Sequence, residues 1–513
     1  MKENTFKIDE ITSWGFYLQV GSEKDIEELL AVRPEYVCRG FMDWGQPASD
    51  YVPHRAIVDR AHQNDILFEG GISFSPVRPR PGEMTAEYYD DLTTHTPAGR
   101  YVDPWENTSY RQGAIHNPRA IDWFLFSMAR PQIEAGIDGL HVDEIEGSYP
   151  WRGLGFDNYA ITEFRKWLLA RYAARGWTET DRRWENELGV DLALHGGTMR
   201  QFDFIRHLQS KNLTDDIEVP HANMDHEFRF QREDTLGKLW GNAWHEKYAG
   251  TFQFDSIERY WTGAVVRLKA DAARITGRDL IVNENMNWVA RSDVDYTMAH
   301  GDLVYHNERG EFDLSVSCAA RIEEVKTCSR RRAGDVPVVF FIDWGPNFSE
   351  MNFIPSGAVN TYICKLAAET AAAGTFFSLP INGGGYNAAS GGYLDTCRDL
   401  AAFFRREKRL FLPGSEFALH PMSGDRQLTV RAYQRNGNKV VHLVNHATRA
   451  PEALLARRDE LLSLELQPGN EIQAYSFEWP GCRDVTIINR EGSQAQIVLP
   501  AFETYCVLEI NGR

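Results

Sequence analysis

The sequence predicts a (β/α)8 TIM barrel, with eight parallel strands alternating with helices, followed by a C-terminal antiparallel β-sandwich. Three observations carry this prediction. Short apolar runs alternate with amphipathic helical segments over the first 411 residues, as in a parallel sheet that helices cover. These runs are nearly continuous, which is typical of strands buried on both faces. After about Leu412, strands follow one another with few helices between them, which favours antiparallel pairing.

The barrel strands are expected where a short apolar run gives way to a polar or glycine-containing segment. In chain order they are residues 14–20, 36–42, 66–72, 140–142, 280–282, 303–305, 336–342 and 375–380. Eight such runs match the number of strands that close a TIM barrel.

Helical segments separate these strands. In the segment 24–31, Ile26, Leu29 and Leu30 are spaced i, i+3 and i+4, which places them on one helix face. The segment 118–135 starts with Asn117 as N-cap and Pro118 at the first helical position, a favoured place for proline. Further helices are expected at 53–64, 156–175, 254–276, 358–373 and 393–408.

Two connections are longer than an ordinary strand–helix loop. A polar stretch rich in Pro and Tyr runs from residue 73 to about 117, and loops of this length usually have a function. The segment of about 176–252 contains Trp184, Trp240, Trp244 and several His residues. We interpret it as an insertion near the mouth of the barrel.

The second domain is expected from 412 to 513, after a barrel domain from 1 to 411. Its strands alternate apolar and polar residues at 428–433, 440–444, 484–488, 495–499 and 505–510. Asn436 and Gly437 separate the first two of these strands, and Asn-Gly between alternating strands is a strong hairpin signal. These features predict an antiparallel sandwich of about 100 residues.

Composition narrows the function classes. The formal net charge is −18, which argues against nucleic acid or anionic membranes as partners. No apolar run approaches the ~18 residues of a membrane span, and no apolar segment follows the N-terminal residues, so a cytoplasmic protein is expected. The seven Cys residues lack metal-type spacing, and the His residues of the insertion lack His-Glu-x-x-His spacing, so neither a metal nor an organic cofactor is expected.

Carboxylates recur at the ends of the predicted strands, and three of them precede or adjoin a tryptophan. The carboxylates are Asp43, Glu69, Asp143, Glu284, Glu308 and Asp343, and the tryptophans are Trp44, Trp288 and Trp344. Barrel enzymes draw catalytic residues from the carboxyl ends of several strands. Individual members of the set could instead cap helices or form ion pairs.

Glycosidic bond cleavage is the chemistry that fits this set. It requires one carboxyl group to protonate the leaving oxygen and another to attack or stabilise the anomeric carbon. Asp143 is the first candidate, because it follows the buried strand 140–142 and shares a face with His141 by the period of two. Aromatic rings beside carboxylates also suit sugars, which have an apolar face and a rim of hydroxyl groups.

The fourth-strand region resembles known glycoside hydrolases. Asn117-Pro118, a helix, and then Asp138-Gly139-Leu140-His141-Val142-Asp143-Glu144 resemble the fourth-strand signature of clan-D-like and family 66 glycoside hydrolases, which include dextranase and cycloisomaltooligosaccharide glucanotransferase. The helix from Phe156 to Tyr172 is similar to its counterpart in related (β/α)8 hydrolases. The residues of 281–285 and 294–308 look like the strand-five and strand-six region of family 66.

The resemblance implies a retaining mechanism with Asp143 as nucleophile and Glu308 as acid/base. Glu308 follows Tyr305 at a longer distance than in the family, so Glu284 and Glu311 stay alternatives. The residues expected to bind substrate are Asp43, Trp44, Glu69, His141, Glu284, Trp288, His306, Asp343 and Trp344.

The expected partner is a glycoside or oligosaccharide, cleaved in an exo-acting manner, and a homo-oligomer is compatible with the sequence. A transglycosidase and a non-catalytic carbohydrate-binding barrel are the alternative functions. A lyase or isomerase acting on sugar acids is weaker, because Arg39 and Arg309 alone give little positive charge for an acidic substrate.

Overall fold

The structure is a computed structural model of the chain. It describes residues 7–17, 19–43, 54–73, 76–77, 84–102, 110–143, 155–214, 229–241, 250–284, 294–300, 303, 305–342, 354–381, 392–416, 427–435 and 437–511.

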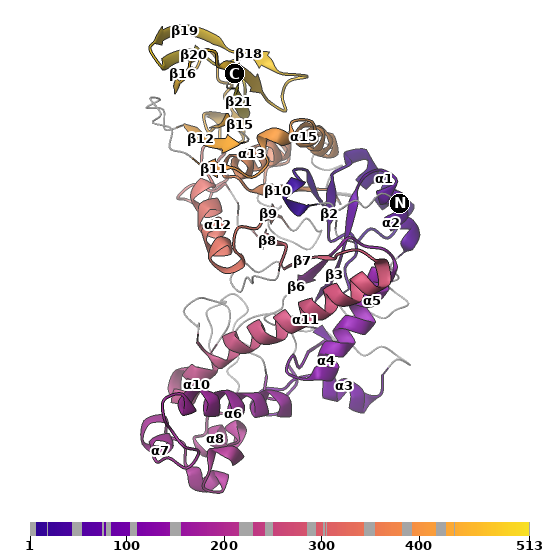
Figure 1. Cartoon of the computed structure of the whole chain (residues 1–513), viewed down its shortest axis with the longest axis vertical. Helices are drawn as coiled ribbons and strands as arrows, with labels where there is room; N and C mark the ends of the chain where they lie inside the picture. The colour runs from indigo at the N-terminus through magenta and orange to yellow at the C-terminus, as the bar shows by residue number, and fades with distance from the viewer. Residues whose placement is uncertain are drawn as a thin grey trace. The chain divides into compact units, whose positions relative to one another are not determined.

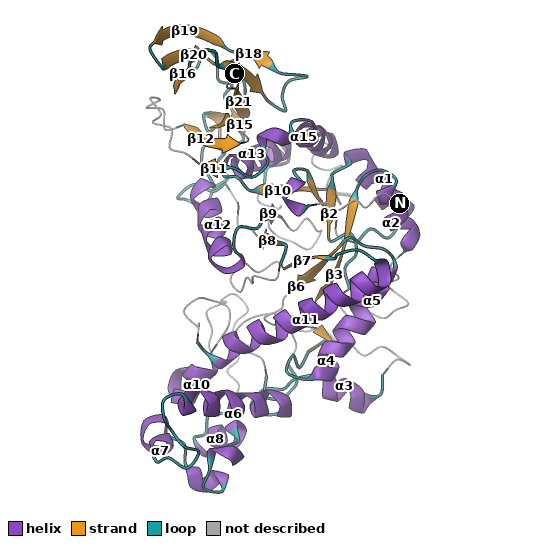
Figure 2. Cartoon of the chain, viewed as in Figure 1, coloured by secondary structure: helices purple, strands orange, loops and turns teal. Residues whose placement is uncertain are grey.

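Eight parallel strands form a closed barrel, which confirms the predicted fold class. In chain order they are β1 (Trp14–Phe16), β2 (Tyr36–Cys38), β3 (Leu67–Ser73), β6 (Gly139–Asp143), β7 (Ile281–Glu284), β8 (Tyr296–His300), β9 (Val338–Phe341) and β10 (Phe376–Pro380). Each strand is hydrogen-bonded to the next one along the chain, and β10 closes the ring against β1. The strands and the helices around them are drawn in Figures 1 and 2.

The first two strands are shorter than predicted. They end at Phe16 and Cys38, and Gln19 and Arg39 follow with φ of 67° and 54°. A positive φ takes the backbone out of the extended conformation. The strands therefore end before the apolar runs of the sequence do.

The sixth barrel strand is β8 (Tyr296–His300) and not residues 303–305, so that prediction is wrong. Leu303 and Tyr305 are buried but belong to no strand. The true strand contains Thr297, whose hydroxyl lies 2.7 Å from the hydroxyl of Ser329 on α12 (Ala319–Ala333). Because Ser329 satisfies its hydrogen bond, Thr297 is acceptable in a buried strand. This partner is 32 residues away, so the sequence around Thr297 does not reveal it.

Helices occupy the predicted segments within a few residues, but two further helices, α3 (Ala86–Leu92) and α12, were not predicted, and α3 lies in the stretch expected to be a loop. The predicted helices of the first half are α1 (Glu23–Val32), α2 (Arg55–His62) and the segment of α4 (Pro118–Trp123), η2 (Phe124–Ala129) and α5 (Arg130–Glu134). Asn117 is the N-cap of α4, and its side chain accepts a hydrogen bond from the backbone N–H of Arg119, as predicted. A short antiparallel pair, β4 (Pro76–Val77) and β5 (Arg111–Gln112), lies in the long connection before this helix.

The chain divides into two compact units, which are described separately. The first consists of Met1–Gly40, Ala56–Glu69 and Asp295–Arg513, and the second of Phe41–Arg55 and Gly70–Val294. The domain boundary expected near residue 411 stays a prediction.

The second unit contains the insertion, whose described residues fold into short helices. These are α7 (Arg183–Leu188), η4 (Leu192–His195), η5 (Met199–Gln201), α8 (Phe204–Ser210), α9 (Arg229–Glu233) and α10 (Thr235–Trp240), and the predicted helices α6 (Asn158–Ala173) and α11 (Phe252–Thr276) stand before and after them in the chain. Figure 1 shows α6, α8 and α10 gathered at one end of α11. Phe164 and Trp240 lie 5.0 Å apart between ring centroids, and Phe164 and Phe252 lie 5.1 Å apart. The aromatic residues described in the insertion therefore mainly fill a core.

The first unit continues after β8 with α12, η9 (Ser356–Ala358), α13 (Val359–Ala372), α15 (Leu394–Arg406) and η10 (Lys408–Leu410), and then with strands. A six-stranded sheet contains β11 (Ser415–Glu416), β12 (Leu428–Arg435), β13 (Asn438–Asn445), β21 (Tyr505–Asn511), β17 (Glu471–Tyr475) and β18 (Arg483–Asp484). A second sheet contains β16 (Leu461–Glu465), β20 (Gln494–Val498) and β19 (Thr486–Glu491), and β14 (Thr448–Ala450) pairs with β15 (Ala453–Leu454).

Buried side chains of both C-terminal sheets form one hydrophobic cluster, which includes Val441, Leu508, Leu464 and Ile497. Arg435 pairs with Asn438 across a two-residue connection, and Gly437 has a φ of 87°. The predicted antiparallel sandwich and its hairpin are therefore confirmed.

Candidate active site

Asp143 is the last residue of β6 and shares a strand face with His141. Leu140 and Val142 point to the opposite face, because successive residues of a strand alternate. His141 is fully buried, Asp143 is 7% exposed, and His141 Nε2 lies 3.9 Å from Asp143 Oδ1. That separation is longer than a hydrogen bond, so the two groups are close neighbours.

Asn283 of the adjacent strand orients His141. The register pairs His141 with Asn283, and His141 Nδ1 lies 2.6 Å from Asn283 Oδ1. Because an amide oxygen can only accept, Nδ1 carries the proton in this arrangement. The Nε2 atom is the one that faces Asp143. Asn283 was not among the predicted site residues, although a polar residue at an inward position of a buried strand was a usable signal.

Glu284 is fully buried on β7, and the register pairs it with Val142. Paired residues of parallel strands project to the same face. Strand alternation therefore places the Glu284 side chain on the face opposite to Asp143.

Asp43 lies where the chain after β2 rejoins β3. It forms a parallel bridge with Ile72, its backbone N–H donates to Gly71 O at 2.9 Å, and its own carbonyl accepts from Ser73 N at 3.0 Å. Asp43 is 3% exposed. The predicted position at a strand end is therefore correct for this residue.

Glu69 lies inside the barrel rather than at its end. It is the third residue of the seven-residue strand β3, which continues through Gly70 and Gly71 to Ser73. Its carboxylate accepts hydrogen bonds from the hydroxyls of Tyr36 (2.8 Å) and Tyr296 (2.5 Å) and from the backbone N–H of Arg39 (3.1 Å). Burial, together with the nearby Cys38 and Glu69, raises the pKa of Tyr296 well above its usual value. The hydroxyls of two buried tyrosines therefore hold this carboxylate.

Glu308 lies at the tip of a turn, eight residues after the end of β8. His306 and Phe312 form an antiparallel bridge at its base, and Asn307 Oδ1 accepts hydrogen bonds from the backbone N–H groups of Arg309 and Glu311. Glu308 and Glu311 are both exposed, whereas His306 is half-buried. The expectation that Glu308 directly follows the sixth strand is wrong, because that strand ends at His300.

Four residues of the predicted set lie outside the described residues. They are Trp44, Trp288, Asp343 and Trp344. Their predicted contribution to substrate binding stays a prediction.

Two histidines of the insertion have structural partners. His207 Nε2 lies 2.9 Å from Asp234 Oδ2, and Asp234 also accepts from Lys211 Nζ at 2.8 Å and caps α10. His195 is buried, and its Nδ1 accepts from Asp203 N. Within the described ranges, no three His, Cys, Asp or Glu side chains are grouped as metal ligands would be.

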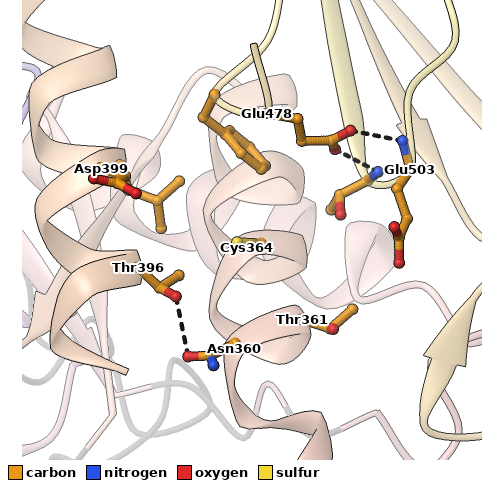
Figure 3. A pocket seen from close by; sticks show the side chains of 10 residues that line it. Asn360, Thr361, Cys364, Thr396, Asp399, Glu478 and Glu503 are labelled. Atoms are coloured by element: carbon orange, nitrogen blue, oxygen red, sulfur yellow. Dashed lines mark hydrogen bonds between the residues drawn. The ribbon is translucent and has the colours of Figure 1, made fainter. Parts of the chain in front are cut away.

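A cavity of about 340 Å³ lies in the first unit, and none of the predicted site residues is among those that line it (Figure 3). Helices α13 and α15 and two loops of the C-terminal sheets form its wall, which includes Asn360, Cys364, Thr396, Asp399, Glu478 and Glu503. The Glu478 carboxylate accepts from the backbone N–H groups of Glu503, Thr504 and Tyr505. It therefore fixes the loop before β21.

Comparison with known proteins shows the fold. No family model matches the chain, and no curated protein matches it. Among solved structures, a cycloisomaltooligosaccharide glucanotransferase from Paenibacillus sp., complexed with cycloisomaltoheptaose, has a TM-score of 0.55 at 10% identity, covering 98% of this chain and 85% of its own.

The chain has the barrel fold of glycoside hydrolases and transglycosidases. A maltogenic alpha-amylase from Thermotoga neapolitana matches with a TM-score of 0.51 at 11% identity, covering 97% of this chain and 98% of its own. An alpha-amylase from Geobacillus thermoleovorans, complexed with acarbose, matches with a TM-score of 0.50 at 8% identity, covering 99% of this chain and 100% of its own. The resemblance to (β/α)8 glycoside hydrolases noted in the sequence therefore fits the structure. Among the described helices, none is both long and apolar enough to cross a membrane.

Proposed function

We propose that this protein is a retaining glycoside hydrolase or transglycosidase that acts on an oligosaccharide, with Asp143 as the nucleophile. The observation that carries the proposal is the position of Asp143. It ends a buried parallel strand and stands on one face with a histidine that a neighbouring strand orients. In TIM-barrel enzymes the carboxyl ends of the strands form the active site.

The reaction proceeds in two displacements. In the first, an Asp143 oxygen forms a bond to the anomeric carbon while the bond to the leaving oxygen breaks and an acid donates a proton to that oxygen. In the second, the same acid, now a base, removes a proton from water or from a sugar hydroxyl, which attacks the anomeric carbon and releases Asp143. Water as the acceptor gives hydrolysis, and a sugar hydroxyl gives transglycosylation.

His141 is proposed to line the sugar site beside Asp143. With its proton on Nδ1, the Nε2 atom can accept a hydrogen bond from a sugar hydroxyl. Asp43 is proposed to accept hydrogen bonds from the same sugar. Glu69, Glu284 and His306, with the aromatic residues Trp44, Trp288 and Trp344 and the carboxylate Asp343, complete the proposed substrate-binding set.

Glu308 is the proposed acid/base, with Glu284 and Glu311 as alternatives. Glu308 is exposed on a turn, and catalytic hydrogen bonds often form only in the substrate complex. Glu284 is buried on the strand beside β6, and it would have to reach around the strand end.

Three Gln variants identify the acid/base. The variant of the true acid/base is expected to lose at least about 10²-fold in kcat/KM on a substrate with a poor leaving group and much less on one with a dinitrophenol leaving group, whose departure needs no proton, while its kcat falls because the second displacement lacks its base. Added azide is expected to restore its turnover as a glycosyl azide. We assign Glu308 if only Glu308→Gln behaves in this way. The same behaviour in Glu284→Gln or Glu311→Gln would transfer the role to that residue.

A panel of nitrophenyl α- and β-glycosides tests the proposed function. We expect one glycoside to be cleaved, with the first product having the anomeric configuration of the substrate when it is observed by proton NMR. Inversion would exclude the double displacement and require a separation of ~6.5–9.5 Å between the two carboxyl groups. Binding of oligosaccharides without any cleavage would favour the alternative of a non-catalytic carbohydrate-binding barrel.

A further inference from the structure

The side-chain amide of Gln132 forms part of the barrel wall. Gln132 belongs to α5 and is fully buried. Its Oε1 accepts a hydrogen bond from Gly71 N at 2.9 Å, and its Nε2 donates to Gly71 O at 2.8 Å. Gly71 lies in β3, so a helix side chain supplies both a donor and an acceptor to the backbone of this strand.

A local change of helix type accompanies this contact. Between α4 and α5, the segment η2 (Phe124–Ala129) is a π-helix, which is a wider turn than the α-helix. Pro131 follows in the next turn, and a proline inside a helix has no N–H and crowds the carbonyl four residues before it. Gln132 Nε2 also donates to Met128 O at 3.2 Å, within the same turn. The π-helical turn changes the helix face on which the following residues lie, and Gln132 lies on the face that contacts β3.

Two glycines allow β3 to be approached from both faces. A Cβ on Gly70 would lie 2.2 Å from Gln132 Oε1. A Cβ on Gly71 would lie 2.5 Å from Met42 Sδ and 3.6 Å from His141 Cβ. Successive residues face opposite sides of a strand, so Gln132 packs on one face of this backbone and His141 on the other.

We propose that Gln132 is a positioning residue for the pair His141 and Asp143, an inference that rests on the proposed function of Asp143. The Gln132 amide holds both the N–H and the carbonyl of Gly71 by hydrogen bonds. Gly71 O in turn accepts from Asp43 N at 2.9 Å, and His141 Cβ lies 3.6 Å from the place that a Cβ on Gly71 would take. A displaced β3 therefore moves two residues of the proposed sugar site, and a misplacement of about 1 Å can cost 10²-fold in rate.

Gln132→Glu tests this with a pH profile. An ionised carboxylate cannot donate to Gly71 O, whereas a protonated carboxyl group can reproduce both hydrogen bonds. We expect kcat to fall about 10- to 100-fold relative to wild type above neutral pH, with a smaller change in KM, and the ratio to wild type to recover as the pH falls. Circular dichroism at each pH ensures that only folded protein is compared.

Gln231→Glu is the matched control. Gln231 is also buried in the second unit, but it belongs to α9, and its Nε2 donates to Gly241 O at 2.7 Å. It is expected to lower stability and to leave kcat within about twofold of wild type. Equal losses of kcat in both variants would reduce the role of Gln132 to general stability and overturn the proposal.

Gly70→Ala supplies a second variant, because its Cβ occupies the place of the Gln132 amide. We expect its effect on kcat to resemble that of Gln132→Ala. The double variant Gly70→Ala/Gln132→Ala should lose no more kcat than the more affected of the two single variants. Additive losses would contradict the proposal.

A magnetic resonance experiment separates failure of this proposal from failure of the proposed function. The imidazole N–H signal of His141, assigned through His141→Gln, is expected to shift in Gln132→Glu and to stay unchanged in Gln231→Glu. A shift in a protein that cleaves no glycoside would keep the positioning role and reject the glycosidase. An unchanged signal in an active enzyme would reject the positioning role alone.

Discussion

Asp143→Asn is expected to lower kcat on a cleaved glycoside by about 10⁴-fold, the scale on which loss of a covalent catalytic group acts. The amide can neither attack the anomeric carbon nor leave from it with ease. The side chain keeps its size and its place beside His141, so the fold and the KM should change little. Steady-state kinetics with the glycoside selected from the panel give the result.

Asp138→Asn is the matched control for this variant. Asp138 directly precedes the same strand at its amino end, where barrel residues serve stability. Its Oδ1 accepts from Arg278 Nη1 at 2.6 Å, and its exposed fraction is 8%. Because Arg278 is 46% exposed, we expect a loss of only about 1 kcal/mol in stability and an unchanged kcat. A near-normal kcat in Asp143→Asn would make Asp143 a structural residue, and the nucleophile would then have to be sought among Glu284, Glu308 and Asp343.

Lys365→Met is expected to reduce the free energy of unfolding by about 3–5 kcal/mol, because it leaves a buried carboxylate without its cation. Lys365 and Glu369 are both buried on α13, with 3.7 Å between Lys365 Nζ and Glu369 Oε1. Lys365 Nζ also donates to the carbonyls of Leu314 and Val316, and Glu369 Oε2 accepts from Cys318 N at 2.6 Å. Two opposite charges on one helix thus hold the segment that leads from the Glu308 turn to α12.

The double variant Lys365→Met/Glu369→Gln tests whether the single variant loses stability because it leaves the Glu369 carboxylate buried without a partner. Replacing both charges removes the uncompensated carboxylate, so the double variant should recover a large part of the stability that the single variant loses. Urea denaturation provides the comparison. A double variant that is less stable than wild type by the sum of the two single losses would show that the two charges act independently.

The same pair predicts a pH dependence of stability. Burial, opposed by Lys365 and the N–H of Cys318, raises the pKa of Glu369 to about 7 in the folded protein, from about 4.3 in an unfolded chain. The native state therefore binds this proton more tightly than the unfolded state. The stability contributed by Glu369 is fully present below about pH 4.3 and is lost as the pH rises through about 7.

We expect wild type to lose up to about 3 kcal/mol between pH 5 and 8 relative to Glu369→Gln, because the amide does not titrate. The difference in urea midpoint between the two proteins at several pH values measures this contribution. A difference that is constant with pH would assign an ordinary pKa to Glu369.

The sequence determined most of the local elements and their order, although not β8, α3 or α12. Apolar spacing located helices such as α1 and α6, Asn117 and Pro118 marked the start of α4, and Asn436 and Gly437 marked the hairpin between β12 and β13, because caps and tight turns are set by a few neighbouring residues. Alternation of short apolar strands with helices also fixed the fold class. Asp143 could be singled out because strand alternation puts it with His141 at a strand end.

Tertiary structure decided which polar residues a buried strand can hold. Thr297 is acceptable in β8 because Ser329 approaches from a helix, Glu69 lies inside the barrel because Tyr36 and Tyr296 donate to it, and Gly71 has the amide of Gln132 as its neighbour. These partners are 32 to 227 residues apart along the chain. A buried polar group is tolerated only when its hydrogen bonds are satisfied, and partners this distant are brought together only by the closed barrel.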